Sequence, residues 1–144
     1  MRKRSAIDLV NLVCGHQLGS GQYRTVFECR LNPDWVVKHD NQNNHSNIFE
    51  LSMWQELQGT ALGKWLAPVE WLSPCGYWLI QHRTQLIRPE ELPAKVPAIF
   101  CDIKASNWGM LHGRPVCHDY GNNQLFTIAR AYGGRLARAV WTKE

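Results

Sequence analysis

The chain has 144 residues, of which 44% are hydrophobic, and it carries a formal net charge of +4 at pH 7. This length suits one globular domain rather than two, because domains commonly hold about 100–150 residues. No apolar run approaches the ~20 residues that cross a bilayer, and the N-terminus lacks the apolar core of a signal peptide, so we expect a cytoplasmic protein with no membrane partner.

The N-terminal region predicts a hairpin followed by a further strand. Residues 7–13 fit either a short amphipathic helix or a strand, since so few positions do not separate the two periodicities. In residues 18–27, Gly19 and Gly21 interrupt an alternating apolar pattern, which is typical of a β-hairpin whose turn lies over a ligand. Residues 32–38 predict a tight Asn-Pro-Asp turn that leads into a strand.

The middle of the chain predicts one helix and a second hairpin. Residues 39–45 are polar and predict an exposed loop. Ser46 or Asn47 is then expected to cap a helix that ends near Gly59. Residues 67–80 predict two strands on either side of a Ser-Pro-Cys-Gly turn. The first half of the chain is therefore expected to be mainly antiparallel sheet with one helix.

The last part of the chain predicts irregular structure, a third hairpin and a final helix. Residues 84–97 contain three prolines, which leave little room for a long helix. Residues 107–118 predict a strand, a turn and a strand. The C-terminal stretch, approximately residues 126–141, predicts one basic helix that Gly133 and Gly134 would interrupt.

The cysteines and the basic residues argue against three classes of protein: disulfide-rich, zinc-binding and nucleic-acid-binding. The number of cysteines is odd and none forms a Cys-x-x-Cys pair, which argues against a disulfide framework and a structural zinc site. We therefore expect free thiols in a reducing compartment. Basic residues gather near both ends, but no aromatic residues alternate with them, so we expect no nucleic-acid partner. The cysteines are Cys14, Cys29, Cys75, Cys101 and Cys117.

Two short motifs, twelve residues apart, carry the chemistry that the sequence predicts. Asp102, Lys104 and Asn107 form an Asp-x-Lys-x-x-Asn motif, and Asp119 begins an Asp-Tyr-Gly turn. Carboxylate and amide oxygens are ligands that Mg²⁺ prefers, and a lysine amine neutralises phosphate charge. Together the two motifs predict a metal site that handles phosphate groups.

Three further features precede these motifs in the chain. They are the Leu-Gly-x-Gly-x-Tyr-x-x-Val loop of residues 18–26, Lys38 at the end of a strand, and Glu50 within a helix. In this order, the loop, the lysine, the glutamate and the two motifs resemble the signature set of the protein kinase family. The resemblance spans residues 18–121. The abbreviated layout of the chain is similar to that of small kinase-like proteins encoded by bacteriophages. It implies a phage or prophage origin and activity in the host cytoplasm.

The resemblance implies an α+β fold in which residues 1–144 form a single reduced kinase-like domain. Residues 7–80, approximately, would form an N-lobe with an antiparallel sheet and one αC-type helix. Residues 98–121 would hold the catalytic and metal loops, with the catalytic-loop hairpin among them. The C-lobe would be strongly truncated, with a basic helix at 126–141, because the long activation loop and the Ala-Pro-Glu segment have no counterpart in the sequence.

The resemblance also implies roles for the catalytic residues. Lys38 would contact the α- and β-phosphates of ATP from a half-exposed position in a cleft, and Glu50 would hold its amine. We prefer Glu50 to Glu56 because Glu50 shares a helix face with apolar residues. Asp102 would accept or orient the proton of the substrate hydroxyl, and Lys104 would stabilise the moving phosphoryl group.

The same resemblance implies the residues that hold the cofactors, which are ATP and Mg²⁺. Asn107 and Asp119 would bind the metal ion. The glycine loop would cover the phosphates, and a hinge near residues 81–83 would bind the adenine edge. The residues expected at the nucleotide are Leu18, Gly19, Ser20, Gly21, Gln22, Tyr23, Val26, Lys38, Gln81 and Arg83.

The sequence also departs from the family. Arg24 stands where the family has a third glycine, and Phe100 and Cys101 replace its His-Arg pair, so regulation through an activation-loop phosphate is not expected. Our first hypothesis is a miniature ATP- and Mg²⁺-dependent kinase that transfers the γ-phosphate to serine or threonine of a protein. The alternatives are a catalytically weak or inactive kinase-like protein that inhibits or sequesters a host protein, and a small-molecule phosphotransferase.

Overall fold

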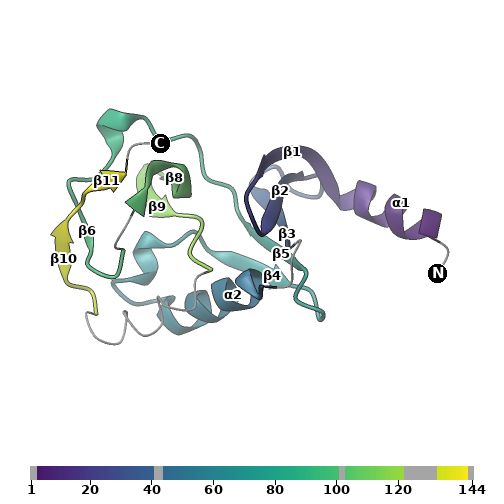
Figure 1. Cartoon of the computed structure of the whole chain (residues 1–144), viewed down its shortest axis with the longest axis horizontal. Helices are drawn as coiled ribbons and strands as arrows, with labels where there is room; N and C mark the ends of the chain where they lie inside the picture. The colour runs from purple at the N-terminus through teal and green to yellow at the C-terminus, as the bar shows by residue number, and fades with distance from the viewer. Residues whose placement is uncertain (1–2, 41–43, 101–102, 122–132, 143–144) are drawn as a thin grey trace.

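A five-stranded antiparallel sheet is the largest element of the computed structural model, which describes residues 3–40, 44–100, 103–121 and 133–142 (Figure 1). The strands follow the order β1-β2-β3-β5-β4, and each neighbouring pair is antiparallel. Both hairpins predicted for the first half are therefore confirmed. The strands are β1 (Cys14–Ser20), β2 (Arg24–Cys29), β3 (Trp35–Asp40), β4 (Val69–Leu72) and β5 (Trp78–His82).

Few helices accompany the strands, so the fold is mixed α+β. The stretch that fitted either a helix or a strand belongs to α1 (Lys3–Val13), and the predicted central helix is α2 (Ser46–Leu57). No α-helix forms in residues 84–97, as expected from the prolines. No described helix is both long and apolar enough to cross a membrane. The remaining turns of helix are η1 (Gly63–Trp65), η2 (Pro89–Glu91) and η3 (Ala105–Asn107).

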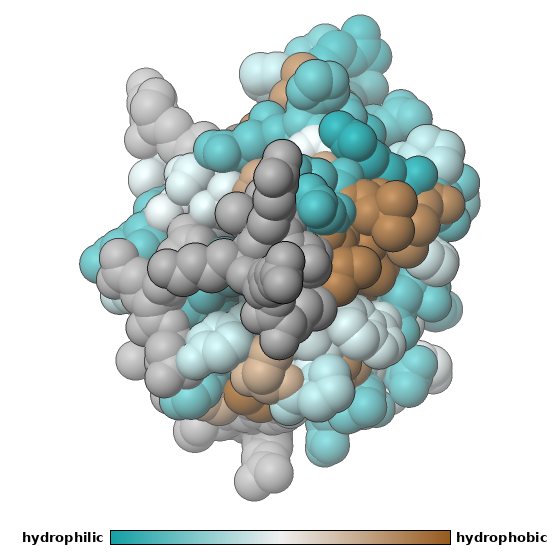
Figure 2. Space-filling view, turned by 90° about the vertical axis from the view of Figure 1, so that its right-hand side faces the viewer, coloured by the Kyte–Doolittle hydropathy of each residue, from teal (hydrophilic) through white to brown (hydrophobic). Residues whose placement is uncertain are grey.

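The first helix, α1, extends from the end of the sheet and away from the rest of the chain (Figure 1). Leu9, Val10 and Leu12 are exposed on it. Figure 2 views the molecule from this side and shows apolar surface gathered in a patch among hydrophilic residues. The last residue of α1, Val13, packs against the buried pair Cys14 and Cys29 in the sheet.

The N-terminus of α2 is not capped as the sequence predicted. His45 is the N-cap residue, in the left-handed conformation with a φ of 65°, and it makes no side-chain capping hydrogen bond. The backbone N–H of Ser46 instead donates to the carboxylate of Asp40 at 3.2 Å. Asp40 is buried at the end of β3, so it does not belong to the exposed loop predicted for residues 39–45.

Asn47, the other predicted cap, has a different task because it is buried within the helix. Its side-chain amide donates to the backbone carbonyls of Lys38 at 3.1 Å and Tyr77 at 2.9 Å. These hydrogen bonds join α2 directly to the sheet. At the other end, the helix stops at Leu57, and Gly59 follows with a φ of 78°, a conformation that glycine adopts without steric cost.

The third predicted hairpin forms in the second half of the chain. Its strands are β8 (Trp108–Leu111) and β9 (Arg114–Cys117). His112 and Gly113 make the turn with positive φ values of 51° and 75°. At the base of this hairpin, a Cβ on Gly109 would come within 2.2 Å of the Thr84 hydroxyl, so glycine allows the strand to approach the segment after β5.

The predicted C-terminal helix is wrong where the structure describes it. Residues 133–134 form a turn and two short strands follow, while residues 126–132 lie outside the described residues. The segment forms β10 (Leu136–Arg138), which pairs with β6 (Lys95–Pro97), and β11 (Trp141–Thr142), which pairs with β7 (Ile103–Lys104).

Tertiary contacts explain why this segment is extended despite its alanine and arginine content. Its backbone forms ladders with two strands that would otherwise present unpaired polar groups. The indole of Trp141 donates to the carbonyl of Pro93 at 3.1 Å and packs edge-on against Trp108, with ring centroids 5.3 Å apart. These contacts outweigh helix propensity, which is a weak preference per residue.

The main core lies between the sheet, α2 and the second half of the chain. Met53 from α2, Leu79 from β5 and Trp108 from β8 are all buried in it. Phe100 and Trp65 also meet Trp108 edge-on, with ring centroids 5.1 and 6.2 Å apart. Because this core contains residues from both halves of the chain, it fixes the position of the β8–β9 hairpin relative to the sheet.

Candidate functional site

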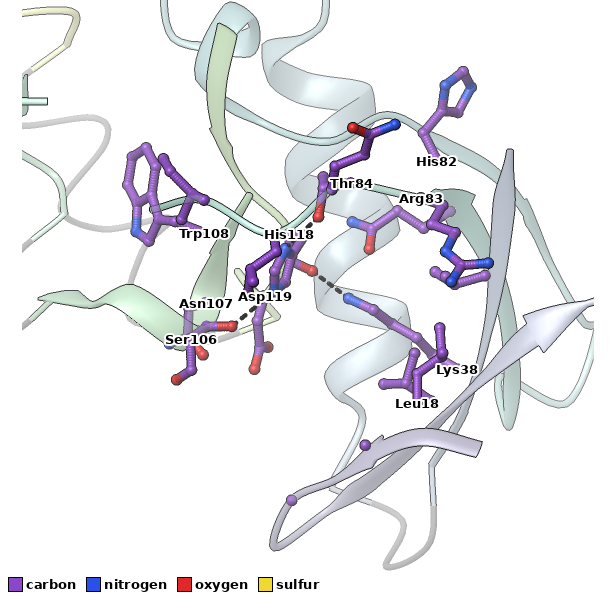
Figure 3. A pocket seen from close by; sticks show the side chains of 18 of the residues that line it. Leu18, Lys38, His82, Arg83, Thr84, Ser106, Asn107, Trp108, His118 and Asp119 are labelled. Atoms are coloured by element: carbon purple, nitrogen blue, oxygen red, sulfur yellow. Dashed lines mark hydrogen bonds between the residues drawn. The ribbon is translucent and has the colours of Figure 1, made fainter. Parts of the chain in front are cut away.

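A cavity of about 760 Å³ lies between the main sheet and the β8–β9 hairpin. The β1–β2 loop, strands β2, β3 and β5, the segment after β5, and the two ends of the hairpin all contribute to its wall. In Figure 3, Lys38 approaches from the sheet, while Asn107, His118 and Asp119 approach from the hairpin side. The structure therefore brings the predicted residues Lys38, Asn107 and Asp119 together around one space, which the predicted residues Val26, Gln81 and Arg83 also line.

The glycine loop forms one edge of this cavity. Gly19, Ser20 and Gly21 line it, whereas Gln22 and Tyr23, which were also expected at the nucleotide, are exposed and do not. An added Cβ on Gly19 or Gly21 would meet no atom within 4 Å. The loop therefore leaves open space beside its backbone, into which a ligand can approach closely.

Lys38 and Glu50 form the pair that the sequence predicted. Lys38 Nζ lies 2.6 Å from Glu50 Oε1, and it also donates to the backbone carbonyl of His118. Lys38 is only 3% exposed, which corrects the half-exposed position expected for it. Burial lowers the pKa of Lys38, and the charge of Glu50 opposes this effect. The amine thus reaches the cavity from a desolvated position.

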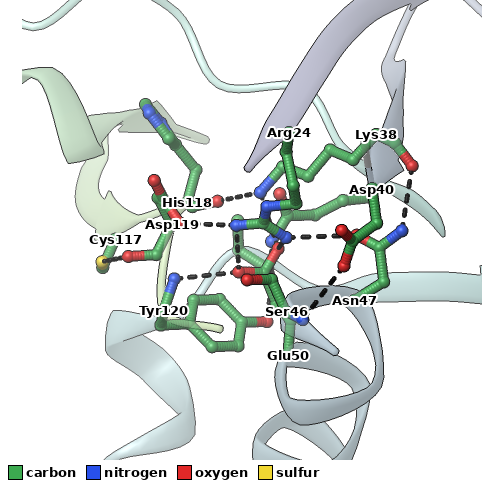
Figure 4. A network of polar contacts seen from close by, with 12 residues as sticks. Arg24, Lys38, Asp40, Ser46, Asn47, Glu50, Cys117, His118, Asp119 and Tyr120 are labelled. Carbon is green, nitrogen blue, oxygen red and sulfur yellow. Dashed lines mark hydrogen bonds and ion pairs between the residues drawn. The ribbon is translucent and has the colours of Figure 1, made fainter. Parts of the chain in front are cut away.

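Glu50 is the centre of the buried polar network in Figure 4. Its side chain is fully buried, and it does not line the cavity itself. Besides the bond from Lys38, its carboxylate accepts two bonds of 3.0 Å from Arg24 and one of 2.9 Å from the backbone N–H of Tyr120. Burial acts to raise the pKa of Glu50, but Arg24 and Lys38 outweigh it and lower the pKa to about 2. Glu50 is therefore ionised.

Asp119 and Asn107 present oxygen atoms at the opposite wall of the cavity. The Asp119 side chain is 51% exposed, and its Oδ1 accepts a bond of 2.5 Å from Arg24. An amide oxygen and a carboxylate suit Mg²⁺, which takes few protein ligands and completes its shell with water and phosphate. Among the described residues, no three His, Cys, Asp or Glu side chains form a metal-binding group.

The close approach behind Asp119 depends on the glycine that follows Tyr120. A Cβ on Gly121 would lie 2.4 Å from the carbonyl oxygen of Ser46, at the start of α2. Glycine is therefore needed here for space, because any side chain would collide with this carbonyl. This contact holds Asp119 close to the helix that carries Glu50.

Of the two remaining predicted catalytic residues, the structure describes only Lys104. Lys104 is exposed in β7 and does not line the wall. Asp102 lies outside the described residues. For the region expected to act on a substrate hydroxyl, the structure therefore describes only the residues that follow Asp102.

The predicted hinge, residues 81–83, lies at the cavity, but several of its polar groups bond to other parts of the protein rather than being free to bind a base. Gln81 is fully buried and lines the cavity, and its Nε2 donates to the carbonyl of Ala67 at 3.3 Å. Its Oε1 is the one buried side-chain oxygen or nitrogen in the described part of the chain that lacks a partner. The backbone N–H of Arg83 donates to the carbonyl of Asp34 at 2.7 Å, so it does not face a ligand.

Three residues at the site were not predicted as functional: Arg24, Thr84 and His118. His118 Nε2 contacts the carbonyl of Ser106 at 2.8 Å, and because a carbonyl only accepts, Nε2 carries the proton. Nδ1 then accepts from the Thr84 hydroxyl at 2.8 Å. Burial, followed by the charge of Lys38, lowers the pKa of His118. A neutral histidine thus joins the hairpin to the segment after β5.

A sequence signal existed for Arg24 but not for Thr84 or His118. Arg24 stands where the kinase resemblance would expect a third glycine, and a large side chain at such a position must find space of its own. The partners of His118 come from segments far apart in the sequence, and no spacing rule connects them.

Comparison with known families and with curated proteins adds no further guide to this site. No family model matches the chain, and no curated protein matches it.

Proposed function

We propose that the chain is a reduced protein-kinase-like phosphotransferase that binds ATP in this cavity. The observation that carries the proposal is the convergence of the glycine loop, Lys38, Asn107 and Asp119 on one space. Phosphoryl transfer needs held phosphates and neutralised charge more than covalent help from protein. A flexible loop backbone, an amine and hard oxygen donors around one cavity are the groups that this chemistry uses.

The arrangement of the sheet and α2 supports the kinase-like part of the proposal. The family resemblance expects an antiparallel sheet, a strand lysine, and a glutamate from the next helix that holds the lysine. Lys38 lies in β3, Glu50 lies in α2, and their charged atoms are 2.6 Å apart. Two such residues meeting across a sheet and a helix is a more specific observation than either motif alone.

The cavity also suits the base of ATP. Leu18, Val26 and Val36 line it with apolar side chains, against which a planar base can pack. Gln81 also lines this wall, but its side chain is fully buried and its amide donates to the carbonyl of Ala67, so the apolar side chains supply the contacts for the base.

The donor set of Asn107 and Asp119 fits a magnesium ion carried on the triphosphate. Arg24 holds Oδ1 of Asp119. Oδ2 of Asp119 and the amide oxygen of Asn107 would then be the atoms that bind the magnesium ion. Mg²⁺, when bound, would neutralise charge on the β- and γ-phosphates. Lys38 would hold the phosphates from the sheet side, and the backbone N–H groups of residues 19–21 would cover them.

We further propose that the acceptor is a serine or threonine hydroxyl of a protein in the host cytoplasm. In this scheme Asp102 receives the hydroxyl proton, the hydroxyl oxygen bonds to the γ-phosphorus, and ADP leaves. Lys104 is exposed next to the cavity segment 105–108, where it is available to the incoming substrate.

A second candidate function is nucleotide binding without turnover, in a protein that sequesters a host partner. The contact between Arg24 and Asp119 favours it, because one oxygen of the expected metal ligand is already occupied by a cation. The two functions share the same cavity and differ in whether phosphate is transferred.

The experiment that separates them follows transfer of labelled phosphate. The purified chain is incubated with [γ-³²P]ATP, Mg²⁺ and a heat-treated cell lysate, in which other kinases are inactive. We expect the natural chain to label lysate proteins. In the variants Asp102→Asn and Asp119→Asn, we expect the rate of labelling to fall by at least about 100-fold. Asp34→Asn, an exposed turn residue, is the matched control and should label normally.

The outcomes are distinct. Equal labelling by all four proteins would overturn the enzyme proposal. Thermal stabilisation of the chain by ATP without any labelling would support the binding-only function instead. Absence of both labelling and stabilisation would contradict ATP as the ligand.

A further inference from the structure

Arg24 is buried at the point where the glycine loop joins the sheet. It is the first residue of β2, it stands at the position of the third family glycine, and it is only 8% exposed. Its guanidinium makes two bonds of 3.0 Å to the two oxygens of Glu50 and one of 2.5 Å to Oδ1 of Asp119. A further contact of 3.3 Å reaches the side-chain oxygen of Asn47.

The two carboxylates that Arg24 joins belong to different halves of the chain. Glu50 lies in α2, and Asp119 follows β9 on the far wall of the cavity (Figure 4). The planar guanidinium can donate in several directions at once, which a lysine amine on a flexible stem does less well. Burial acts to lower the pKa of Arg24, but the charges of Glu50 and Asp119 outweigh it and raise the pKa. The guanidinium is thus a permanent positive charge beside Asp119.

The four groups that meet here in ion pairs balance in charge without a metal ion. Arg24 and Lys38 are positive, and Glu50 and Asp119 are negative. Without Arg24, the same group would leave one net negative charge facing the phosphates of a nucleotide. A divalent cation would then be needed to offset repulsion between Asp119 and the phosphates, because such interactions are strong at short range in a poorly solvated site.

We propose that Arg24 is a built-in counter-ion for Asp119 that allows this cavity to bind the triphosphate of ATP without a divalent metal ion. This inference rests on the proposed function, since it assumes that ATP enters the cavity. It concerns the binding step alone. The glycine loop supplies the phosphate contacts, and Arg24 removes the charge that would oppose them.

The test measures the affinity of the natural chain for ATP by calorimetry, in buffer with Mg²⁺ and in buffer with EDTA. We expect the two dissociation constants to agree within about threefold. In Arg24→Gln, which removes the charge, we expect binding in EDTA to be at least about tenfold weaker than in Mg²⁺. Arg24→Lys keeps a positive charge and should stay closer to the natural chain.

The matched control is Arg114→Gln, which removes the same charge from an exposed position in the β8–β9 hairpin. It should show the metal independence of the natural chain. If Arg24→Gln weakens ATP binding equally in both buffers, Arg24 is only a structural brace and the proposal is overturned.

The remaining outcomes separate this inference from the proposed function. Binding by the natural chain that requires Mg²⁺ overturns the inference and leaves the proposed function standing. No binding of ATP in either buffer overturns the proposed function, and this inference with it. If Arg24→Gln does not fold, the two titrations of the natural chain still decide, because they need no variant.

Discussion

At the scale of single residues, Glu50 organises the polar interior. It accepts hydrogen bonds from Lys38, Arg24 and the backbone of Tyr120, and it is fully buried. Burial of a charge is costly unless all its hydrogen-bonding capacity is used, and here four donors use it. The network therefore joins β2, β3, α2 and the segment after β9 through one carboxylate.

The depressed pKa of Glu50 makes stability depend on pH. The pKa is about 2 in the folded chain and 4.5 in its ordinary state, so the unfolded chain takes up a proton first as the pH falls. The stabilisation is present above about pH 4.5 and is lost as the pH falls toward 2. We expect denaturant unfolding to show a loss of about 2 kcal/mol from this group between pH 5 and pH 3.

Glu50→Gln tests this assignment. We expect the variant to be less stable by about 3 kcal/mol at pH 7, because two buried cations lose a partner, and to depend less steeply on pH below 5. Glu56→Gln removes a carboxylate from an exposed position on the same helix and should keep the pH profile of the natural chain. Identical profiles for both variants would show that Glu50 is not the titrating group.

At the scale of elements, a substitution in the glycine loop is expected to affect ligand binding without affecting stability. Gly21 does not have a positive φ, and an added Cβ meets nothing within 4 Å. We expect Gly21→Val to change the free energy of unfolding by less than about 1 kcal/mol and to weaken ATP binding by at least about tenfold. Thermal denaturation and calorimetry measure the two effects.

Gly113 provides the opposite case for comparison. It also has open space around it, but its φ is 75°, a conformation that a branched side chain adopts only with strain. Gly113→Val should lower stability by at least about 1 kcal/mol and leave ATP binding unchanged. If Gly21→Val binds ATP normally, the glycine loop does not approach the nucleotide.

The last strands of the chain hold its C-terminal segment to the core. Trp141 packs on Trp108 and donates to Pro93, so Trp141→Ala should destabilise the chain by about 3 kcal/mol. Val140 is 76% exposed, and Val140→Ala should change stability by less than about 0.5 kcal/mol. Chemical denaturation of both variants checks this. A small effect of Trp141→Ala would mean that the segment lies apart from the core.

The elements that the sequence predicted correctly are those with local signals. The three hairpins follow from strand-like segments on either side of local turns, such as the glycine loop and the Ser-Pro-Cys-Gly turn, and α2 follows from its apolar positions. The C-terminal helix was wrong because partners distant in sequence, such as Lys95–Pro97, determine its conformation. The cap of α2 was wrong for a different reason, because the carboxylate of Asp40, only six residues before Ser46, accepts the N–H at the start of the helix.

Prediction of the site shows the same division. The motif order was enough to select Lys38, Glu50, Asn107 and Asp119, whose positions relative to one another the structure then supplies. The bridging role of Arg24 needed coordinates, because it depends on how closely α2 and the segment after β9 approach each other.

At the scale of the whole molecule, the main core places a sheet and a hairpin on opposite sides of one cavity. Residues of both halves surround Trp108, so the separation between Lys38 and Asp119 is set by packing and not by a connecting loop. The proposed function requires that this space receive the phosphates of a nucleotide.

A crystal structure of the chain with a slowly hydrolysed ATP analogue tests that requirement most directly. We expect a base beside Gln81 and a triphosphate beneath residues 19–21, within hydrogen-bonding distance of Lys38 and close to Asp119. Analogue bound elsewhere on the molecule, or a cavity that stays empty at a saturating concentration of analogue, would contradict this expectation.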